Sequence, residues 1–437
     1  MALPLSRIDL RGTDDLEAGL PRPSTADERP EAAVREIVSE VRTRGDAAVL
    51  ELTERFDGVR LDSLLVEPSA VSAALERTDP RLIEALRFAA GRIEAHHRAQ
   101  LRPEVSHTDS GVTVRSVARA VRSAGCYVPG GRAAYPSTLL MTAIPARVAG
   151  VDRVVVCVPP DRTTGAVSSV TLAAAAVAGV DELYSVGGAQ AIAAMAYGTE
   201  SIAPVEVICG PGNMFVAVAK QQVAGDVGIA AAFAGPSEVV VVADASVDPD
   251  LVAIDLMLQA EHGPDGLAWL VTWDPGVAAA VDDSLERLLA EAPRREEIAA
   301  TLERSGYCVL VDGPDAAVEV VDQVAPEHLE LLCGGAEGLA DRVQNAGAIF
   351  CGAWSPASLG DYLAGPSHVL PTHGSARFAS ALGVADFTKD VHVITAGPDG
   401  VRALAPAAIA LAEAEGLDAH AESLRKRLAL VDGPDHD

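Results

Sequence analysis

Hydrophobic residues recur at helical spacing through the first hundred positions of the chain. Residues 31–56 carry apolar side chains three or four positions apart, and residues 68–101 continue this pattern. Both stretches are predicted to be helical. Residues 1–29, which precede them, are polar, contain prolines and lack a clear period. We expect this segment to be a small N-terminal arm.

From residue 124 the pattern changes to short apolar runs that alternate with helical stretches. One such series covers residues 125–237, and a second begins at residue 238 and ends near residue 351. Strands that alternate with helices predict a parallel, doubly wound sheet. We therefore expect an α/β protein with two Rossmann-like parallel-sheet domains, one inserted in the other.

The helices before residue 124 need a sheet to cover, and the second series supplies one. We expect residues 30–124 and 238–384 to form the first α/β domain, with residues 125–237 inserted into it. The C-terminal helical tail, residues 385–437, contains one strand pattern and two helix patterns. It is too short to bury a core alone, so we expect it to dock on another surface, such as a second subunit.

The balance of charge excludes one class of partner. The net charge of −28 repels phosphate backbones, so we expect no nucleic acid partner. Apolar runs stay below the roughly 18 residues of a membrane helix, and the first residues lack a secretory apolar core. We expect a cytoplasmic protein with no membrane span. The cysteines are scattered without a C-x-x-C pair, which predicts neither disulfides nor a zinc knuckle.

An acid and a base stand side by side in Pro326-Glu327-His328. The apolar run from Leu329 to Cys333 follows directly and is predicted to be a strand. The proline ends the preceding helix, and loops at strand ends are where α/β proteins place chemistry. An isolated pair of this kind more often lies on a solvated turn, but further stretches favour a catalytic interpretation.

Gln259 and His262 lie three positions apart at the end of a predicted helix, which places both side chains on one face. An amide oxygen and an imidazole nitrogen can both bind a divalent metal, although glutamine is a rare ligand. A metal site and an ordinary helix end both remain open at this point.

Asp361 and His368 fall in a predicted loop rich in glycine and other small residues. They could be metal ligands, substrate contacts or plain turn residues, because aspartate commonly caps its own backbone. Glu415 and His420 flank Gly416, where the last two predicted helices separate. Charged residues in such positions usually face water.

Two glycine turns, Pro129-Gly130-Gly131 and Gly210-Pro211-Gly212-Asn213, follow predicted strands of the first series. Free backbone N–H groups at helix starts bind pyrophosphate. Neither turn matches the G-x-G-x-x-G fingerprint of dinucleotide sites. Tight helix–strand connections explain these glycines equally well.

Several blocks, in this order along the chain, together resemble the histidinol dehydrogenase family over essentially the whole length. They are Tyr127-Val-Pro-Gly-Gly131, Val186-Gly-Gly-Ala-Gln-Ala-Ile192, Gly210-Pro-Gly-Asn213, Ala234-Gly-Pro-Ser-Glu-Val239, Gln259-Ala-Glu-His-Gly-Pro264, Pro326-Glu-His-Leu329, Ser358-Leu-Gly-Asp-Tyr362, His368-Val-Leu-Pro-Thr372 and Glu415-Gly-Leu-Asp-Ala-His420. Members of this family are zinc-dependent homodimers that oxidise L-histidinol to L-histidine in two NAD-linked steps, the end of histidine biosynthesis.

The resemblance implies a role for each matching residue. It implies one zinc per subunit, held by Gln259, His262, Asp361 and His420, which with Glu327 also lie at the substrate. It implies further substrate contacts at Ser237, His368 and Glu415, and NAD contacts at Tyr127, Gln190 and Asn213. The tail would cross to the partner subunit, so that Glu415 and His420 complete the neighbouring site. Pro366-Ser367 depart from the family pattern, which predicts a local change beside His368.

The resemblance also implies a mechanism. His328 would act as general base in both oxidations, since an imidazole suits that role near neutral pH, and Glu327 would activate the water that attacks the aldehyde. No cysteine lies in a motif with a base, so we expect no thiol catalysis. One alternative is a related zinc and NAD dehydrogenase that acts on another chelating alcohol, such as a sulfonated diol. Another is a zinc-dependent hydrolase or a non-catalytic metal-binding protein.

Overall fold

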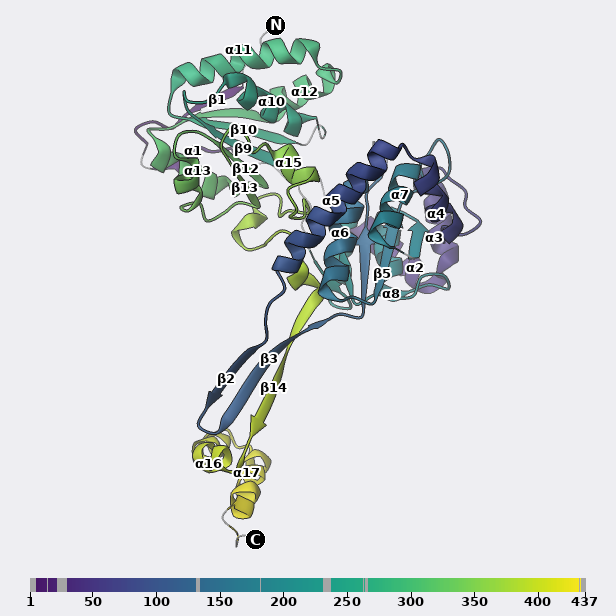
Figure 1. The fold of residues 1–437 in the computed structure, drawn as a ribbon, viewed down its shortest axis with the longest axis vertical. Helices are drawn as coiled ribbons and strands as arrows, with labels where there is room; N and C mark the ends of the chain where they lie inside the picture. Colours follow the sequence, from purple (N-terminus) through teal and green to yellow (C-terminus); the bar gives the residue numbers. More distant parts are fainter. Residues whose placement is uncertain are drawn as a thin grey trace. The chain divides into compact units, whose positions relative to one another are not determined.

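The structure of the protein is a computed structural model (Figure 1). It describes residues 5–13, 15–21, 30–130, 134–180, 182–230, 237–261, 263, 266–431 and 433. The chain divides into two compact units, one formed by residues 1–100 and 122–387 and the other by residues 101–121 and 388–437. In the described part of the chain, no helix is long and apolar enough to cross a membrane.

Sheet A, in the larger unit, is parallel throughout. In spatial order its strands are β1 (Ser6–Asp9), β11 (Gly306–Leu310), β10 (Leu267–Thr272), β9 (Glu238–Ala243), β12 (His328–Leu332) and β13 (Ala348–Cys351). Strand β1 falls within the expected irregular arm, and that expectation is wrong here. A strand so short has no readable period, although Leu5 and Leu10 at its ends are buried.

Helices cover both faces of sheet A (Figure 1). One face packs against α10 (Pro249–Ala260), α11 (Pro275–Glu291) and α12 (Arg295–Ser305). The other packs mainly against α13 (Pro314–Val324), with α1 (Leu16–Gly19) and α14 (Ala336–Ala340) beside it. This layering explains why the strands are apolar on both faces and read as continuous hydrophobic runs.

Sheet B, also in the larger unit, is parallel as well. Its strands in spatial order are β6 (Glu182–Ser185), β5 (Arg153–Val158), β4 (Ser123–Tyr127), β7 (Val207–Cys209) and β8 (Gly228–Ile229). The helices that follow its strands are α6 (Pro136–Ala149), α7 (Ser169–Ala178), α8 (Gly188–Tyr197) and α9 (Met214–Val223). Because β1 precedes this segment and β9 follows it, the chain enters sheet A on both sides of sheet B. The α/β class with two parallel sheets is confirmed.

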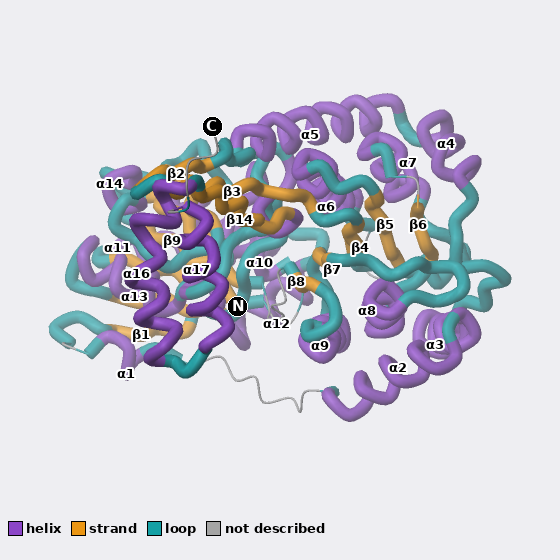
Figure 2. The backbone as a smooth tube through the Cα atoms, turned by 90° about the horizontal axis from the view of Figure 1, so that it is seen from below, coloured by secondary structure: helices purple, strands orange, loops and turns teal. Residues whose placement is uncertain are grey.

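The N-terminal helices pack on sheet B, not on sheet A as expected (Figure 2). These helices are α2 (Glu31–Arg44), α3 (Asp46–Asp57), α4 (Pro68–Arg77) and α5 (Pro80–Ala99). Val34 and Val41 of α2 share a core with Ile192 and Met195 of α8. The expectation fails because helical periodicity predicts which face is buried and says nothing about which sheet buries it.

The smaller unit contains an antiparallel sheet and a helical pair. Its strands in spatial order are β14 (Thr388–Ala396), β3 (Val112–Ala120) and β2 (Val105–Asp109), and its helices are α16 (Pro398–Ala414) and α17 (Asp418–Val431). Strands β2 and β3 are missing from the sequence-based prediction. Their side chains are exposed or only half-buried, so no apolar run marks them.

Apart from the edge strand β1, the strands β9–β13 of sheet A have the same spatial order as the strands β4–β8 of sheet B. In each, the first strand of the series is central, the next two strands lie to one side, and the last two lie to the other. The order therefore reverses between β9 and β12 in sheet A and between β4 and β7 in sheet B. Such switch points are where open α/β sheets bind ligands.

Candidate functional site

The acid and base of the Pro326-Glu327-His328 turn lie at the switch point of sheet A. His328 opens β12 and pairs in register with Val239 of the neighbouring strand β9. Ser237 and Glu238 stand at the start of β9. These residues all lie at the amino ends of their strands, the edge opposite to the one that usually binds ligands in open α/β sheets.

His328 lies between two carboxylates. Its Nδ1 is 3.8 Å from Glu327 Oε2, and its Nε2 is 3.5 Å from Asp361 Oδ1. Burial lowers the pKa of this imidazole, but the negative charges of Glu327 and Asp361 outweigh burial and raise the pKa to about 9. A cation held at Asp361 would offset one of these charges and favour the neutral ring that a general base requires.

Glu327 is buried and held by the start of the neighbouring strand. Its Oε2 accepts a hydrogen bond from the backbone N–H of Glu238 at 3.2 Å, and its carboxylate also bonds the Ser237 side chain. Burial raises the pKa of Glu327, and the nearby His328 charge opposes that rise. A buried carboxylate in this state is a better proton acceptor than an exposed one.

Asp361 lies in a short helix, α15 (Ala357–Tyr362), where the sequence predicted a loop. His368 Nδ1 lies 3.0 Å from the backbone oxygen of Asp361, and its Nε2 lies 2.9 Å from the Thr138 hydroxyl on α6. A carbonyl only accepts, so Nδ1 carries a proton, and in the neutral ring Nε2 then accepts from Thr138. His328, Asp361 and His368 line one cavity, together with Phe350.

Pro366-Ser367, the departure from the family pattern, is well held beside His368. Ser367 is buried, and its hydroxyl donates to the backbone oxygen of Met141 at 3.0 Å. The loop therefore has a firm attachment to α6 at this point.

Gln259 is brought to the same edge of sheet A. It lies at the end of α10, which returns from the carboxyl end of β9 to the amino edge. The side chain is buried, and its Nε2 has no hydrogen-bond partner among the described residues. His262 lies outside the described residues. Among the residues that are described, no three His, Cys, Asp or Glu side chains form a ready metal cluster.

Glu415 and His420 belong to the smaller unit. Glu415 caps the end of α16 and His420 lies in the first turn of α17, and both are exposed. Within that unit they lie near the Gly416 break, as the sequence predicted.

A second cavity lies at the carboxyl edge of sheet B and gathers the three expected NAD contacts, Tyr127, Gln190 and Asn213. The Tyr127 hydroxyl accepts from Gly188 N at 3.2 Å. Gln190 is buried, and neither polar atom of its amide has a hydrogen-bond partner in the described chain. Asn213 caps α9 by accepting from Val216 N at 3.1 Å. An unsatisfied buried amide beside a helix start fits a polar ligand.

The glycine turn after β7 allows the strands to approach closely. Gly210 has a φ of +103°, and a Cβ there would lie 2.0 Å from the backbone oxygen of Tyr127. The Lys220 ammonium on α9 donates to the Gly210 carbonyl. Burial lowers the pKa of Lys220 to about 8. Only glycine fits at position 210, so this turn is a requirement of the site geometry.

The family model for histidinol dehydrogenase matches residues 20–428. The chain belongs to the histidinol dehydrogenase family. It is 48% identical over 431 residues to histidinol dehydrogenase of Mesorhizobium japonicum, covering 98% of this chain and 100% of that relative. It is 46% identical over 433 residues to the Rhizobium meliloti protein of the same name, covering 98% and 99%. The crystal structure of histidinol dehydrogenase from Elizabethkingia anophelis matches with a TM-score of 0.94 and 33% identity, covering 99% of this chain and 100% of that one.

Membership of the histidinol dehydrogenase family makes the protein an oxidoreductase of histidine biosynthesis. The donor set at sheet A fits zinc in its chemistry. Gln259 offers a buried amide and Asp361 a carboxylate, and zinc binds nitrogen and oxygen donors of this kind. The edge of sheet B fits a dinucleotide, because two helices begin there beside an unsatisfied amide.

Some residues of this histidinol dehydrogenase site are absent from the sequence-based prediction. Phe56 and Asp57 line the cavity of sheet B from α3, which lies outside the inserted segment, and no local motif marks them. Glu330 and Asp255 are buried next to the sheet A site. Each is an acid inside an apolar run, so the sequence alone could have marked both as candidate buried acids.

Proposed function

We propose that the protein is a zinc-dependent, NAD-linked histidinol dehydrogenase that oxidises L-histidinol through L-histidinal to L-histidine. The observation that carries this proposal is the buried Glu327–His328 pair facing Asp361, in a chain of this family. A base beside a candidate metal ligand suits oxidation of an alcohol that can chelate the metal. We also propose that the reaction takes place in the cytoplasm.

The residues that would hold zinc are Gln259, His262, Asp361 and His420. Bound there, zinc would supply a Lewis acid that orients the imidazole and amine nitrogens of the substrate. Ser237, His368 and Glu415 would contact the remaining polar groups of the substrate. NAD would be bound by Tyr127, Gln190 and Asn213, and it supplies the hydride acceptor.

In the first oxidation, His328 accepts the hydroxyl proton of histidinol while the carbinol carbon loses a hydride, which leaves the aldehyde. Glu327 then takes a proton from a water molecule, whose hydroxide adds to the aldehyde carbon, and His328 returns its proton to the carbonyl oxygen to give a hydrate. In the second oxidation, His328 accepts a proton from this hydrate as its carbon loses a second hydride. The products are the carboxylic acid and two reduced nicotinamides, so atoms and electrons balance.

We propose that the tail of one subunit completes the site of its partner. Glu415 and His420 are exposed within their own unit, and a zinc ligand is of use only where it can reach the metal. A homodimer that exchanges tails would bring His420 to Asp361 of the other subunit.

NADH formation by the zinc-loaded protein tests the proposed reaction. Histidinol and histidinal should both be oxidised, with two NADH formed for each histidinol consumed. A protein that oxidises neither histidinol nor histidinal but oxidises a sulfonated diol would be the related dehydrogenase instead. A protein that reduces no NAD with any chelating alcohol would contradict both assignments.

Mixed dimers test the shared site. Glu327→Gln and His420→Ala homodimers should each be nearly inactive, and their mixture should regain activity because one of its two sites keeps both residues intact. A mixture that forms mixed dimers and recovers nothing would overturn the exchange of tails.

A further inference from the structure

Two acidic residues that the proposed reaction does not use are buried just inside the sheet A site. Asp255 lies on α10 and is 8% exposed, and Glu330 lies on β12 and is fully buried. Buried carboxyl groups are costly unless they are neutral or paired, so their presence needs a physical reason.

The two carboxyl groups lie close enough for each to shift the pKa of the other. Two ionised carboxylates can only accept hydrogen bonds, so a hydrogen bond between them requires a proton on one of them. Glu330 Oε1 already accepts from the backbone N–H of Ala357 at 2.6 Å. Its buried Oε2 has no donor partner in the described chain, and it is the oxygen that can carry the proton to Asp255. Burial, then the charge of Asp255, raise the pKa of Glu330 to about 9.

This acid pair connects the three elements that carry the site. Asp255 precedes Gln259 by one helical turn on α10, and Glu330 follows His328 by two residues on the same face of β12. Ala357, which donates to Glu330, begins α15, the helix of Asp361. The three residues Asp255, Glu330 and Ala357 thus lie on α10, β12 and α15.

The offsets from the acid pair to the site also match. Four helical residues span about 6 Å and two strand residues about 6.6 Å. Helix α10 runs antiparallel to β12, because it returns from the end of β9 to the start of β10 in a parallel sheet. Gln259 and His328 are therefore both displaced from the acid pair toward the amino edge of sheet A, by similar distances.

We propose that Asp255 and Glu330, sharing one proton, are positioning residues that hold Gln259, His328 and Asp361 in one arrangement. This inference rests on the proposed function for the roles of those three residues. Neither acid is among the residues proposed to contact the substrate. They act through the helix end of α10, the strand start of β12 and the first turn of α15.

Two substitutions of Glu330 distinguish the effect of its hydrogen bonds from the effect of its side-chain volume. Glu330→Gln keeps both bonds, because its amide N–H can donate to Asp255 and its carbonyl can accept from Ala357. Glu330→Met has a similar length and keeps neither. We expect Glu330→Met to weaken zinc binding and lower kcat/KM for histidinol by about 10- to 100-fold, the usual effect of losing a residue that supports metal ligands. Glu330→Gln should stay within about threefold of the wild type.

Hydrogen exchange in the zinc-free protein gives a readout that does not depend on the metal. Amides of α15 and of the last turn of α10 should exchange faster in Glu330→Met than in Glu330→Gln, and NAD affinity should not change in either. If Glu330→Met does not fold, Asp255→Ala replaces it. That variant breaks only the tie to α10, so exchange should rise there while α15 stays protected.

The outcomes distinguish this inference from the proposed function. A wild-type protein that neither binds zinc nor oxidises histidinol contradicts the function, whereas the exchange difference still tests the acid pair. Equal exchange and equal zinc affinity in the Met and Gln variants would overturn the acid pair. So would a Gln variant as impaired as the Met variant, because the shared proton would then not be the feature that matters.

Discussion

Apart from the edge strand β1, sheets A and B have the same strand order, yet their candidate sites lie on opposite edges. In sheet B, Tyr127 is the last residue of β4 and Asn213 follows the carboxyl end of β7, as open α/β sheets usually arrange a ligand site. In sheet A, Ser237 and His328 lie at the amino ends of the equivalent strands, β9 and β12. Strand order alone therefore fixes the switch point and leaves the edge undecided.

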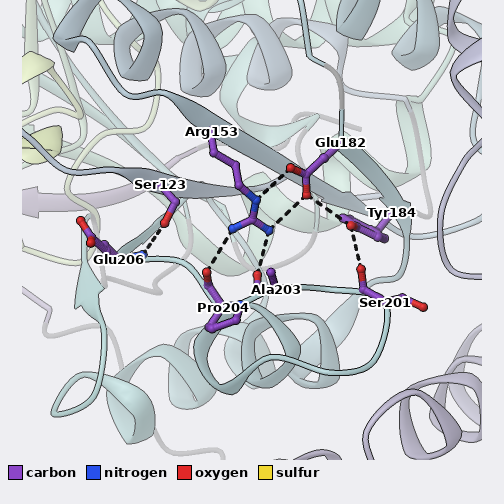
Figure 3. A network of polar contacts seen from close by, with 8 residues as sticks. All are labelled: Ser123, Arg153, Glu182, Tyr184, Ser201, Ala203, Pro204 and Glu206. Atoms are coloured by element: carbon purple, nitrogen blue, oxygen red, sulfur yellow. Dashed lines mark hydrogen bonds and ion pairs between the residues drawn. The ribbon is translucent and has the colours of Figure 1, made fainter.

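In both sheets, polar groups at the edge without a candidate site form hydrogen bonds with other protein groups. At the amino edge of sheet B, Arg153 binds Glu182 through two nitrogens, and Ser123 accepts from the backbone N–H of Glu206 (Figure 3). At the carboxyl edge of sheet A, Asp244 accepts from the backbone N–H of Gly334 at 2.9 Å. In each sheet, the edge with the candidate site is the one that keeps buried polar groups available for a ligand.

The two open edges also differ in their chemistry. The edge of sheet A gathers groups that exchange protons, Glu238, Glu327, His328 and Asp361, with pKa values raised at the first three. The edge of sheet B offers mainly amides, a phenol and backbone N–H groups, which hold a ligand without exchanging protons near neutral pH. The proposed function therefore places catalysis at the edge of sheet A and NAD binding at the edge of sheet B.

Substitutions at the two edges should separate these roles. Glu327→Gln should lower kcat by about 10²–10⁴-fold, because the amide cannot accept a proton, and the histidinal step should suffer more than the histidinol step. Asn213→Ala should mainly weaken NAD binding, by about tenfold, through loss of the α9 cap and its amide. Steady-state kinetics on both substrates and NAD titration measure these effects. Equal losses of the two oxidation steps in Glu327→Gln would count against its role with water.

The fold of the larger unit was largely predictable, because long apolar runs alternate with helical periods in both sheets. The partner sheet of α2–α5 was not, since amphipathicity does not name the surface that a helix covers. Strands β2 and β3 escaped prediction because exposed antiparallel ribbons carry little hydrophobic signal. Strand β1 is too short for any pattern to mark it.

The site was predictable only as far as local motifs reached. The Glu327–His328 turn and the Gly210–Asn213 turn have composition that points to a function. The strand predicted directly after Glu327 places that residue at an amino end, but the sequence could not show that this edge carries the site, because that depends on which polar groups the loops satisfy. Asp57 reaches the sheet B cavity from a distant helix, and only the folded chain brings it there.

Substitution of Gly210 should test how closely β4 and β7 must approach at the sheet B edge. Gly210→Ala introduces a Cβ 2.0 Å from Tyr127 O at a left-handed φ, so we expect a loss of about 2–4 kcal/mol in the free energy of unfolding and weaker NAD binding. Gly225→Ala, in the same sheet B region with nothing within 4 Å of its Cβ, is the matched control and should change neither. Thermal unfolding and NAD titration decide this, and an unaffected Gly210→Ala would show that the turn can relax.

Loss of Arg153 should destabilise sheet B without affecting its binding edge. Its guanidinium bonds Glu182 and the backbone oxygens of Ala203 and Pro204 (Figure 3). Arg153→Met removes these contacts from a partly exposed site, so we expect a cost of about 1–2 kcal/mol. NAD affinity should stay unchanged, because the opposite edge keeps its contacts. A change in NAD affinity as large as that of Asn213→Ala would mean that the two edges are not independent.

Glu238 should make the sheet A edge sensitive to pH. Burial, then the charge of Glu327, raise the pKa of Glu238 to about 8 from the usual 4.5. The folded protein therefore binds this proton more tightly than the unfolded chain, so its contribution to stability is full below pH 4.5 and is lost as pH rises through about 8. Glu238→Gln cannot ionise and should escape this loss. Its thermal midpoint relative to the wild type should rise between about pH 5 and pH 8, by the equivalent of at least about 1 kcal/mol. A constant difference across that range would mean that Glu238 is ionised in the folded protein, and the sheet A edge would then carry more negative charge than its burial suggests.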